Sequence, residues 1–198
     1  AAYPLVFLTA WHMLVTRARL QAGETVLVHA AGSGVGHAAV QIAKHLNATV
    51  YATVGSDAKI PKAKALGADE VIPYQREDVV TRIHTLTSGR GVDVVVEHIG
   101  PQTWEGSVRV LGKGGRLVTC GATNGSQVAL DVNVLFGRHL SLLGSWMGRR
   151  AELIEALRFV ASGQIVPVVD VAMPLAEARA AHERLEAGKH FGKIVLVP

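Results

Sequence analysis

The sequence predicts a doubly wound α/β fold with a six-stranded parallel sheet, and three observations lead to this prediction. Short apolar, β-branched runs recur along the chain. Stretches of helical length and spacing separate these runs, and glycine-rich turns bound them. Parallel strands need crossover connections and bury both faces, so strands that alternate with helices favour a parallel sheet with helices on each side.

Residues 1–15 form the first expected element, a buried helix. This stretch carries no formal charge apart from protonation of His12. It lacks the basic leader of a signal peptide and is shorter than a membrane span, so a helix within the core is the better interpretation. Because the chain begins abruptly, we expect it to be cut from something longer.

The predicted core covers about residues 20–146. Its strands are expected at residues 25–30, 49–53, 70–72, 92–96, 116–120 and 140–144. The helices between them are expected at residues 35–46, 62–66, 78–86 and 102–110, and a glycine turn at 112–115 precedes the fifth strand. The order of these elements is that of successive βαβ units.

Residues 147–198 are expected to add helices and a return strand to the core. Two stretches, 152–161 and 175–187, have amphipathic helical patterns, and 193–197 is an apolar strand. We find no repeat, linker or low-complexity segment, and 198 residues with 49% hydrophobic composition can bury a sizeable core. Residues 1–198 are therefore predicted to form one domain.

Charge and cysteine content narrow the class of partner. Lys and Arg number 20 against 16 Asp and Glu, and the basic residues are scattered, whereas a nucleic acid needs a basic face or stripe. The single cysteine, Cys120, excludes an internal disulfide and a multi-cysteine metal cluster, and it indicates a reducing compartment. We expect a cytoplasmic protein that binds neither nucleic acid nor a membrane.

A glycine-rich loop joins the first predicted strand to the helix at 35–46. Small residues at Ala31, Ser33 and Gly36 depart from strict G-x-G-x-x-G spacing but still allow a tight turn close to a pyrophosphate. The first amides of the helix would point at phosphate oxygens. The place of the loop between a strand and a helix predicts a Rossmann dinucleotide site, and a turn that only packs helix on strand is the alternative. The predicted contacts are Ser33, Gly34, Val35 and Gly36.

Four segments in order resemble signatures of the medium-chain dehydrogenase/reductase superfamily: AAGSGVGHAAVQIAK, GSDAKIPKAKALGADEVIPY, GKGGRLVTCGAT and EAGKHFGKIVLVP. The resemblance spans essentially the whole chain, including PLVFLTAWHML at its start, and is strongest to the zinc-type alcohol dehydrogenases and the quinone oxidoreductases. It implies the cofactor-binding domain of an oxidoreductase. Such an enzyme transfers hydride between a nicotinamide dinucleotide and a small molecule: an alcohol or carbonyl, a quinone or an activated alkene.

The tip of the second strand favours NADP(H) over NAD(H). An acid there would accept from a ribose hydroxyl and repel a 2′-phosphate, and residues 52–54 contain none. In family members that use the phosphorylated cofactor, a GSxxK segment and a later tyrosine contact the phosphate, and Ser56, Lys59 and Tyr74 match them here. Asp57, which falls in the first helical turn, is the argument for NAD(H).

The resemblance also implies contacts on the nicotinamide side at His98, Ile99 and Gly121, which follow the fourth and fifth predicted strands. In zinc-dependent relatives most metal ligands lie in an amino-terminal substrate domain, which this chain is expected to lack. The remaining ligand is a cysteine at the position of Leu5. The nine histidines form no HExxH motif or close Cys/His set. Zinc therefore remains open for a full-length enzyme, but no metal ligand or catalytic residue is assigned in this chain.

Two other functions stay open at this point. S-adenosylmethionine also binds a glycine loop, although a methyltransferase usually needs an acid at the second strand tip. A stand-alone nucleotide-binding or redox-sensing module without catalysis is the other alternative. In the oxidoreductase interpretation the isolated chain binds cofactor but turns over little, and residues 140–144 pair two chains into a homodimer.

Overall fold

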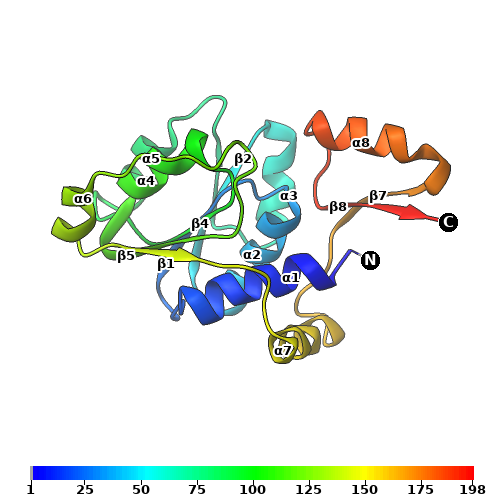
Figure 1. The fold of residues 1–198 in the computed structure, drawn as a ribbon, viewed down its shortest axis with the longest axis horizontal. Coiled ribbons are helices and arrows are strands. Elements are labelled where there is room, and N and C mark those ends of the chain that lie inside the picture. The colour runs from blue at the N-terminus through cyan, green and yellow to red at the C-terminus, as the bar shows by residue number, and fades with distance from the viewer. Residues whose placement is uncertain (1) are drawn as a thin grey trace.

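The computed structural model describes residues 2–198 and confirms the doubly wound fold (Figure 1). A parallel sheet has the strand order β3-β2-β1-β4-β5-β6. Because the chain runs outward from β1 to β3 and then returns to β4, the winding direction reverses between β1 and β4. The strands are β1 (Thr25–Val28), β2 (Thr49–Val54), β3 (Glu70–Pro73), β4 (Val92–Glu97), β5 (Leu111–Thr119) and β6 (Ser141–Gly144).

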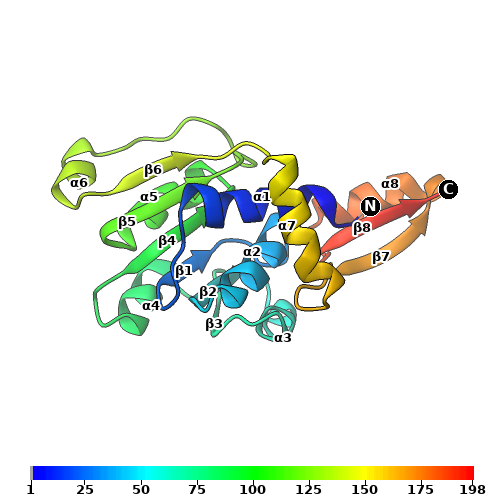
Figure 2. The same cartoon turned by 90° about the horizontal axis from the view of Figure 1, so that it is seen from below.

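Helices cover both faces of this sheet. One face packs against α1 (Pro4–Trp11), its π-helical continuation η1 (His12–Arg17) and α2 (Gly34–His45), and α7 (Arg150–Ala161) lies over α1 (Figure 2). The short η2 (Asp57–Lys59) and α3 (Ile60–Ala65) follow β2, and Ala63 joins the same cluster. The other face packs against α4 (Val79–Leu86), α5 (Pro101–Arg109) and α6 (Val132–Gly137).

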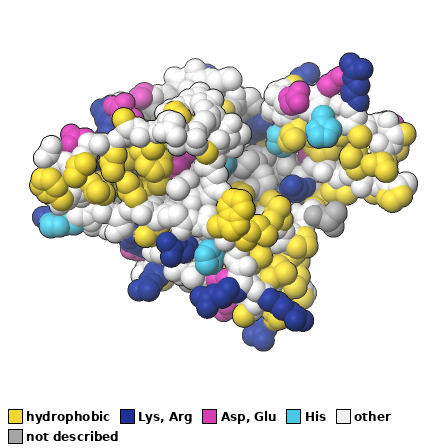
Figure 3. Space-filling view, in the orientation of Figure 1, with side chains coloured by type: hydrophobic (Ala, Val, Ile, Leu, Met, Phe, Trp, Pro, Cys, Tyr) yellow, Lys and Arg dark blue, Asp and Glu magenta, His cyan; other side chains and the backbone are white. Residues whose placement is uncertain are grey.

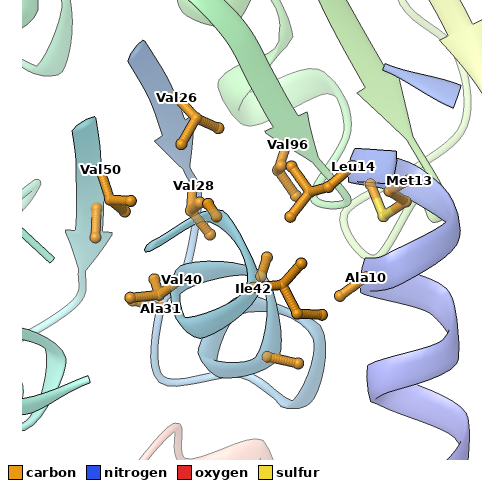
Figure 4. Packing of buried hydrophobic residues seen from close by; sticks show 14 of the residues in the cluster. Ala10, Met13, Leu14, Val26, Val28, Ala31, Val40, Ile42, Val50 and Val96 are labelled. Atoms are coloured by element: carbon orange, nitrogen blue, oxygen red, sulfur yellow. The ribbon is translucent and has the colours of Figure 1, made fainter. Parts of the chain in front are cut away.

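Alternation along the central strands divides the core between these two faces. Val26 and Val28 contact the α1–α2 side, whereas Leu27 between them contacts the α4–α5 side. Figure 4 shows the side chains of Val96, Ile42 and Leu14 gathered between the sheet, α2 and η1. Full burial of each such side chain stabilises the fold by about 1.5–3 kcal/mol. The opening helix is therefore part of the core, as predicted; Ala1 lies outside the described residues.

The glycine turn expected before the fifth strand lies inside it. In the pairing of β4 with β5, Val92 faces Leu111 and Val94 faces Arg116, so residues 112–115 loop out as a wide bulge. A Cβ on Gly115 would lie 2.9 Å from the Gly112 carbonyl oxygen, so the bulge needs a residue without a side chain there. The strand consequently begins five residues earlier than the sequence predicts.

The carboxyl-terminal part contains one strand that the sequence did not predict. β7 (Val169–Pro174) pairs in parallel with β8 (Lys193–Val197), and η3 (Leu175–Glu177) with α8 (Ala178–Glu186) connects them. The helix α6 was also not predicted. In the described part of the chain, no helix is long and apolar enough to cross a membrane.

Candidate cofactor site

The glycine loop begins directly after β1 and turns into α2. Ala30 adopts a left-handed backbone with φ of 46°, and a Cβ on Gly36 would lie 2.1 Å from the Ala30 carbonyl oxygen. Only glycine fits at position 36 without moving this backbone. Ser33 caps the helix, because its Oγ accepts from the Gly36 amide at 2.9 Å.

The four predicted glycine-loop residues therefore form one helix terminus. Ser33 is the cap, and Gly34, Val35 and Gly36 are the first three residues of α2. The first amides of a helix have no acceptor within it, and the helix dipole adds partial positive charge there. A helix terminus of this kind favours a bound anion.

A pocket of about 570 Å³ opens at the point where the winding direction reverses. It is lined from the carboxyl ends of four neighbouring strands: His29 after β1, Thr53 in β2, Tyr74 after β3 and Ile99 after β4. Open α/β sheets bind ligands in this position. The structure thus brings the predicted residues Tyr74 and Ile99 to the same cavity.

A second pocket of about 560 Å³ adjoins the first and shares Tyr74 with it. Ser56 and Lys59 line this second pocket, so the three residues expected at a 2′-phosphate surround one space. The Lys59 Nζ donates to the Gly188 carbonyl oxygen at 2.7 Å, and burial lowers its pKa. The hydrogen-bond partner of Lys59 is thus a neutral carbonyl group and not a carboxylate.

Asp57 lies in the first helical turn after β2, as expected, where it begins η2, and it is paired. Its carboxylate lies 2.9 Å from the Arg76 guanidinium, and both side chains are more than half exposed. Arg76 also lines the first pocket. An ion pair with arginine reduces the ability of Asp57 to repel a phosphate.

The carboxyl-terminal segment contributes a cation that sequence reasoning missed. The Gly192 amide donates to the Gly32 carbonyl oxygen at 2.8 Å, which lays residues 188–193 along the glycine loop. A Cβ on Gly34 would lie 3.8 Å from the Lys193 Nζ. The two glycine–lysine pairs in GKHFGK were the available signal, but only the fold shows which loop they meet.

The residues predicted on the nicotinamide side follow β4 and β5. The His98 imidazole is buried, and its Nε2 donates to the His29 carbonyl oxygen at 3.0 Å, so the ring is turned into the protein. Burial lowers the His98 pKa and favours the neutral ring. A Cβ on Gly121 would lie 3.4 Å from the His98 carbonyl oxygen, so this glycine and the loop after β4 are neighbours.

Neither Cys120 nor the histidines form a metal-ligand set. Burial raises the pKa of the Cys120 thiol to about 11, so it is protonated at neutral pH. Leu5, at the position of the family's cysteine ligand, is 54% exposed. Within residues 2–198, no group of three or more His, Cys, Asp or Glu side chains could hold a metal ion.

Comparison with known proteins agrees with this geometry. The family model described as zinc-binding dehydrogenase matches residues 34–162. Quinone oxidoreductase 1 of Escherichia coli (strain K12) is 36% identical over 212 residues, which cover 100% of this chain and 64% of that protein. Highly reducing polyketide synthase PKS6 of Gibberella zeae is 30% identical over 99% of this chain, which is only 8% of the synthase.

Two solved structures share the fold over the whole chain. A structure described as an NAD-dependent alcohol dehydrogenase is 45% identical with a TM-score of 0.94, and the chain covers 57% of it. The 2-octenoyl-CoA carboxylase reductase CinF, in complex with NADP and 2-octenoyl-CoA, is 30% identical with a TM-score of 0.92, and the chain covers 48% of it. The chain thus spans less than two thirds of each of these relatives. It belongs to the zinc-binding dehydrogenase family of the medium-chain dehydrogenase/reductase superfamily.

Proposed function

We propose that the chain is the cofactor-binding part of an oxidoreductase that transfers hydride between NADP(H) and an alcohol or carbonyl, a quinone or an activated alkene. The observation that carries the proposal is the convergence of four strand ends on one pocket, where the chain after β1 continues from His29 into a capped, glycine-rich helix terminus. The cofactor, when bound, supplies the hydride chemistry, and the protein supplies binding and orientation. The family favours this function over methyl transfer.

Each end of the dinucleotide has candidate contacts. In this proposal the amides of Gly34 and Val35 bind the pyrophosphate, and Lys193 adds a positive charge beside them. Ser33 and Gly36 shape the turn around it, because their amides already donate to the Ala30 carbonyl oxygen and the Ser33 Oγ. Ile99, Gly121 and the backbone at His98 lie on the nicotinamide side, where β4 and β5 end.

The preference for NADP(H) depends on the second pocket. Ser56, Lys59 and Tyr74 would bind the 2′-phosphate there, and Arg76 neutralises Asp57 nearby. The solved relatives include one described as NAD-dependent and one in complex with NADP. Family membership alone therefore leaves the choice of cofactor open, and these residues support the proposal of NADP(H).

The proposal includes a second domain that completes the active-site cleft. The β7–β8 sheet has only two strands, and Val169 and Val197 on it are more than 40% exposed. Parallel strands are usually buried on both faces. Figure 3 shows hydrophobic side chains gathered on this part of the molecule. We propose that a substrate domain covers them, and that the chain alone has little or no turnover.

We also propose a homodimer through β6, at the edge of the sheet. Its outer backbone groups are unpaired with any strand of the described chain. Val132 and Phe136 on the neighbouring α6 are 60% and 65% exposed, and Figure 3 shows hydrophobic side chains on this end as well. A monomeric mass by light scattering would argue against the dimer.

Calorimetric titration with NADPH and, separately, NADH tests the cofactor assignment. We expect tighter binding of NADPH, and Lys59→Ala should weaken it about tenfold or more, because a charged hydrogen bond contributes about 1.5–3 kcal/mol. Lys113→Ala, in the exposed bulge of β5, is the matched control. Tighter binding of NADH would make Asp57 the ribose partner.

Two other outcomes would redirect the proposal. Binding of neither dinucleotide would favour another ligand or a site that needs the second domain. Binding without turnover, even when the complete protein is assayed with alcohols, quinones and activated alkenes, would favour a non-catalytic nucleotide-binding or redox-sensing module.

A further inference from the structure

A buried carboxylate lies beneath the pocket, where β4 ends. Glu97 has no exposed surface, and its Oε1 accepts from the amides of Ile99 at 2.6 Å and Gly100 at 3.2 Å. Its Oε2 accepts from the hydroxyls of Ser107 at 2.7 Å and Thr103 at 2.9 Å. Burial acts to raise the pKa of Glu97, but the interaction with His29 and these donors outweigh it and lower the pKa. Glu97 therefore fixes the loop at residues 98–100 as a charged acceptor.

The hydrogen bond from Ser107 to Glu97 fixes the direction of the one between Ser107 and His29. The Ser107 hydroxyl gives its only proton to Glu97, so its oxygen accepts from the His29 Nε2 at 2.9 Å. His29 must therefore carry its proton on Nε2. Burial lowers the His29 pKa to about 4, which keeps the ring neutral at neutral pH.

The other side of the imidazole leads to the glycine loop. The His29 Nδ1, which carries no proton, faces the Thr53 hydroxyl at 3.4 Å. The Thr53 oxygen in turn accepts from the Ala30 amide at 3.0 Å. Ala30 has the left-handed backbone described above, and Gly36 packs against its carbonyl oxygen. A single directed chain of hydrogen bonds thus runs from Ala30 through His29 and Ser107 to Glu97.

We propose that His29, Ser107 and Glu97 are positioning residues that hold the glycine loop and the loop at 98–100 in one relative geometry for a bound dinucleotide. The inference rests on the proposed function, because the two loops are the candidate contacts for the pyrophosphate and the nicotinamide side. A dinucleotide spans both loops at once. A fragment that lacks the pyrophosphate and nicotinamide does not span both loops. Comparing the affinities of the dinucleotide and the fragment therefore tests the proposal.

The first experiment compares NADPH with adenosine 2′-phosphate in calorimetric titrations. His29→Leu removes both ring hydrogen bonds. We expect its NADPH affinity to be lower by about tenfold or more, because the buried partners Ser107 and Thr53 lose their hydrogen bonds to the ring. Adenosine 2′-phosphate affinity should change less than about twofold on the same scale. His29→Gln, which restores a donor toward Ser107, should recover part of the NADPH affinity.

Ser107→Ala is the milder variant if His29→Leu fails to fold, and Ser162→Ala at the exposed end of α7 is its control. We expect Ser107→Ala to weaken NADPH binding about threefold or more and the control to leave it unchanged. Equal losses for NADPH and adenosine 2′-phosphate would show instead that His29 contacts the adenosine or that the fold is damaged. Unchanged NADPH affinity in both the His29 and Ser107 variants would overturn the proposal.

A second measurement separates this inference from the proposed function. Imidazole ¹⁵N shifts of His29 should show a neutral ring with its proton on Nε2, whether or not a ligand is bound. A proton on Nδ1, or a charged ring at neutral pH, would overturn the hydrogen-bond chain. If neither the unaltered chain nor the complete protein binds NADPH or NADH, the proposed function fails, and the positioning role fails with it even where the tautomer is correct.

Discussion

The Glu152 side chain joins two helices, η1 and α7, that are far apart in the sequence. Its Oε1 accepts from the His12 Nδ1 at 2.8 Å and from the Thr16 hydroxyl, and its Oε2 accepts from the Arg149 amide at 2.5 Å. Burial acts to raise the pKa of Glu152, but the donors from Thr16, Arg149 and His12 outweigh it and lower the pKa to about 2. The carboxylate thus ties η1 to the start of α7.

Glu152→Gln should change how stability depends on pH. A carboxyl group with a lowered pKa stabilises the folded state above its unfolded pKa of about 4.5, and this contribution is lost as pH falls towards 2. We expect the variant to be less stable at pH 7 by about 1–3 kcal/mol and to lose less stability between pH 4.5 and 2. Urea unfolding across this range measures both effects. Parallel curves for the two proteins would contradict the prediction, and Glu155→Gln, exposed on the same helix, is the control.

Gly36→Ala should damage the candidate cofactor site more than the fold as a whole. The added Cβ would lie 2.1 Å from the Ala30 carbonyl oxygen, so the glycine loop must move. We expect NADPH binding to weaken at least about tenfold and stability to fall by about 1–3 kcal/mol. Gly137→Ala, where a Cβ meets nothing within 4 Å, should leave binding unchanged. Calorimetry and thermal unfolding of both variants would decide, and normal NADPH affinity in the first would refute the assigned loop geometry.

The core strands and the helices between them were predictable from neighbouring residues, whereas β7 and the short α6 were not. The six core strands follow from runs of Val, Leu and Ile, and the helices between them follow from spacing. β7 reads VDVAMP, is half-exposed and pairs only with a strand nineteen residues later, so its sequence lacks a core-strand signature. The bulge at 112–115 was mistaken for a turn because glycine serves both structures.

The same distinction applies to the candidate site. Ser56, Lys59 and Tyr74 come from motifs, and the fold places them around one pocket. Lys193 and the pair of His29 with Glu97 were missed, because each becomes significant only beside residues far away in sequence. A histidine in an apolar strand is usually a packing residue, and no spacing rule indicates its partner.

The Gln41 side chain attaches the segment that leads to β7 to α2. The Gln41 amide donates to the Val166 carbonyl oxygen at 3.0 Å, and its Oε1 accepts from the Val166 amide at 2.8 Å. Gln41→Ala should leave both backbone groups of Val166 unpaired, at a cost of about 1–3 kcal/mol.

Hydrogen exchange tests this attachment locally. In Gln41→Ala we expect faster exchange at the amides of Val166 and Gly192 while the amides of β1 and β4 keep their protection. Gln127→Ala, in an exposed segment, is the matched control. Unaltered exchange at Val166 would show that the segment is held by its packing alone.

For the whole molecule, buried neutral histidines set the response to mild acid. Burial lowers the pKa of His29, His37 and His98, the first of them to about 4. Between the unfolded pKa of 6.5 and the lower folded values, the unfolded chain binds more protons. The contribution of these histidines to the free energy of unfolding is therefore complete above pH 6.5 and falls as the pH drops below that value.

Urea midpoints between pH 7.5 and 5 measure this slope. We expect a continuous decline, and His37→Gln should make it shallower because one buried histidine no longer resists protonation. His182→Gln, on the exposed surface of α8, should keep the slope of the unaltered chain. A flat profile in the unaltered chain would contradict the burial of these rings.

The contact between Gly192 and Gly32 also bears on the order in which the protein is made. A ribosome releases residues 25–144 first, so all six strands of the sheet are available before residues 188–193 emerge. Only then can the Gly192 amide donate to the glycine loop and the Gly188 carbonyl oxygen accept from the Lys59 Nζ. The nascent chain therefore exposes all six strands of the sheet before its glycine loop can acquire these neighbours.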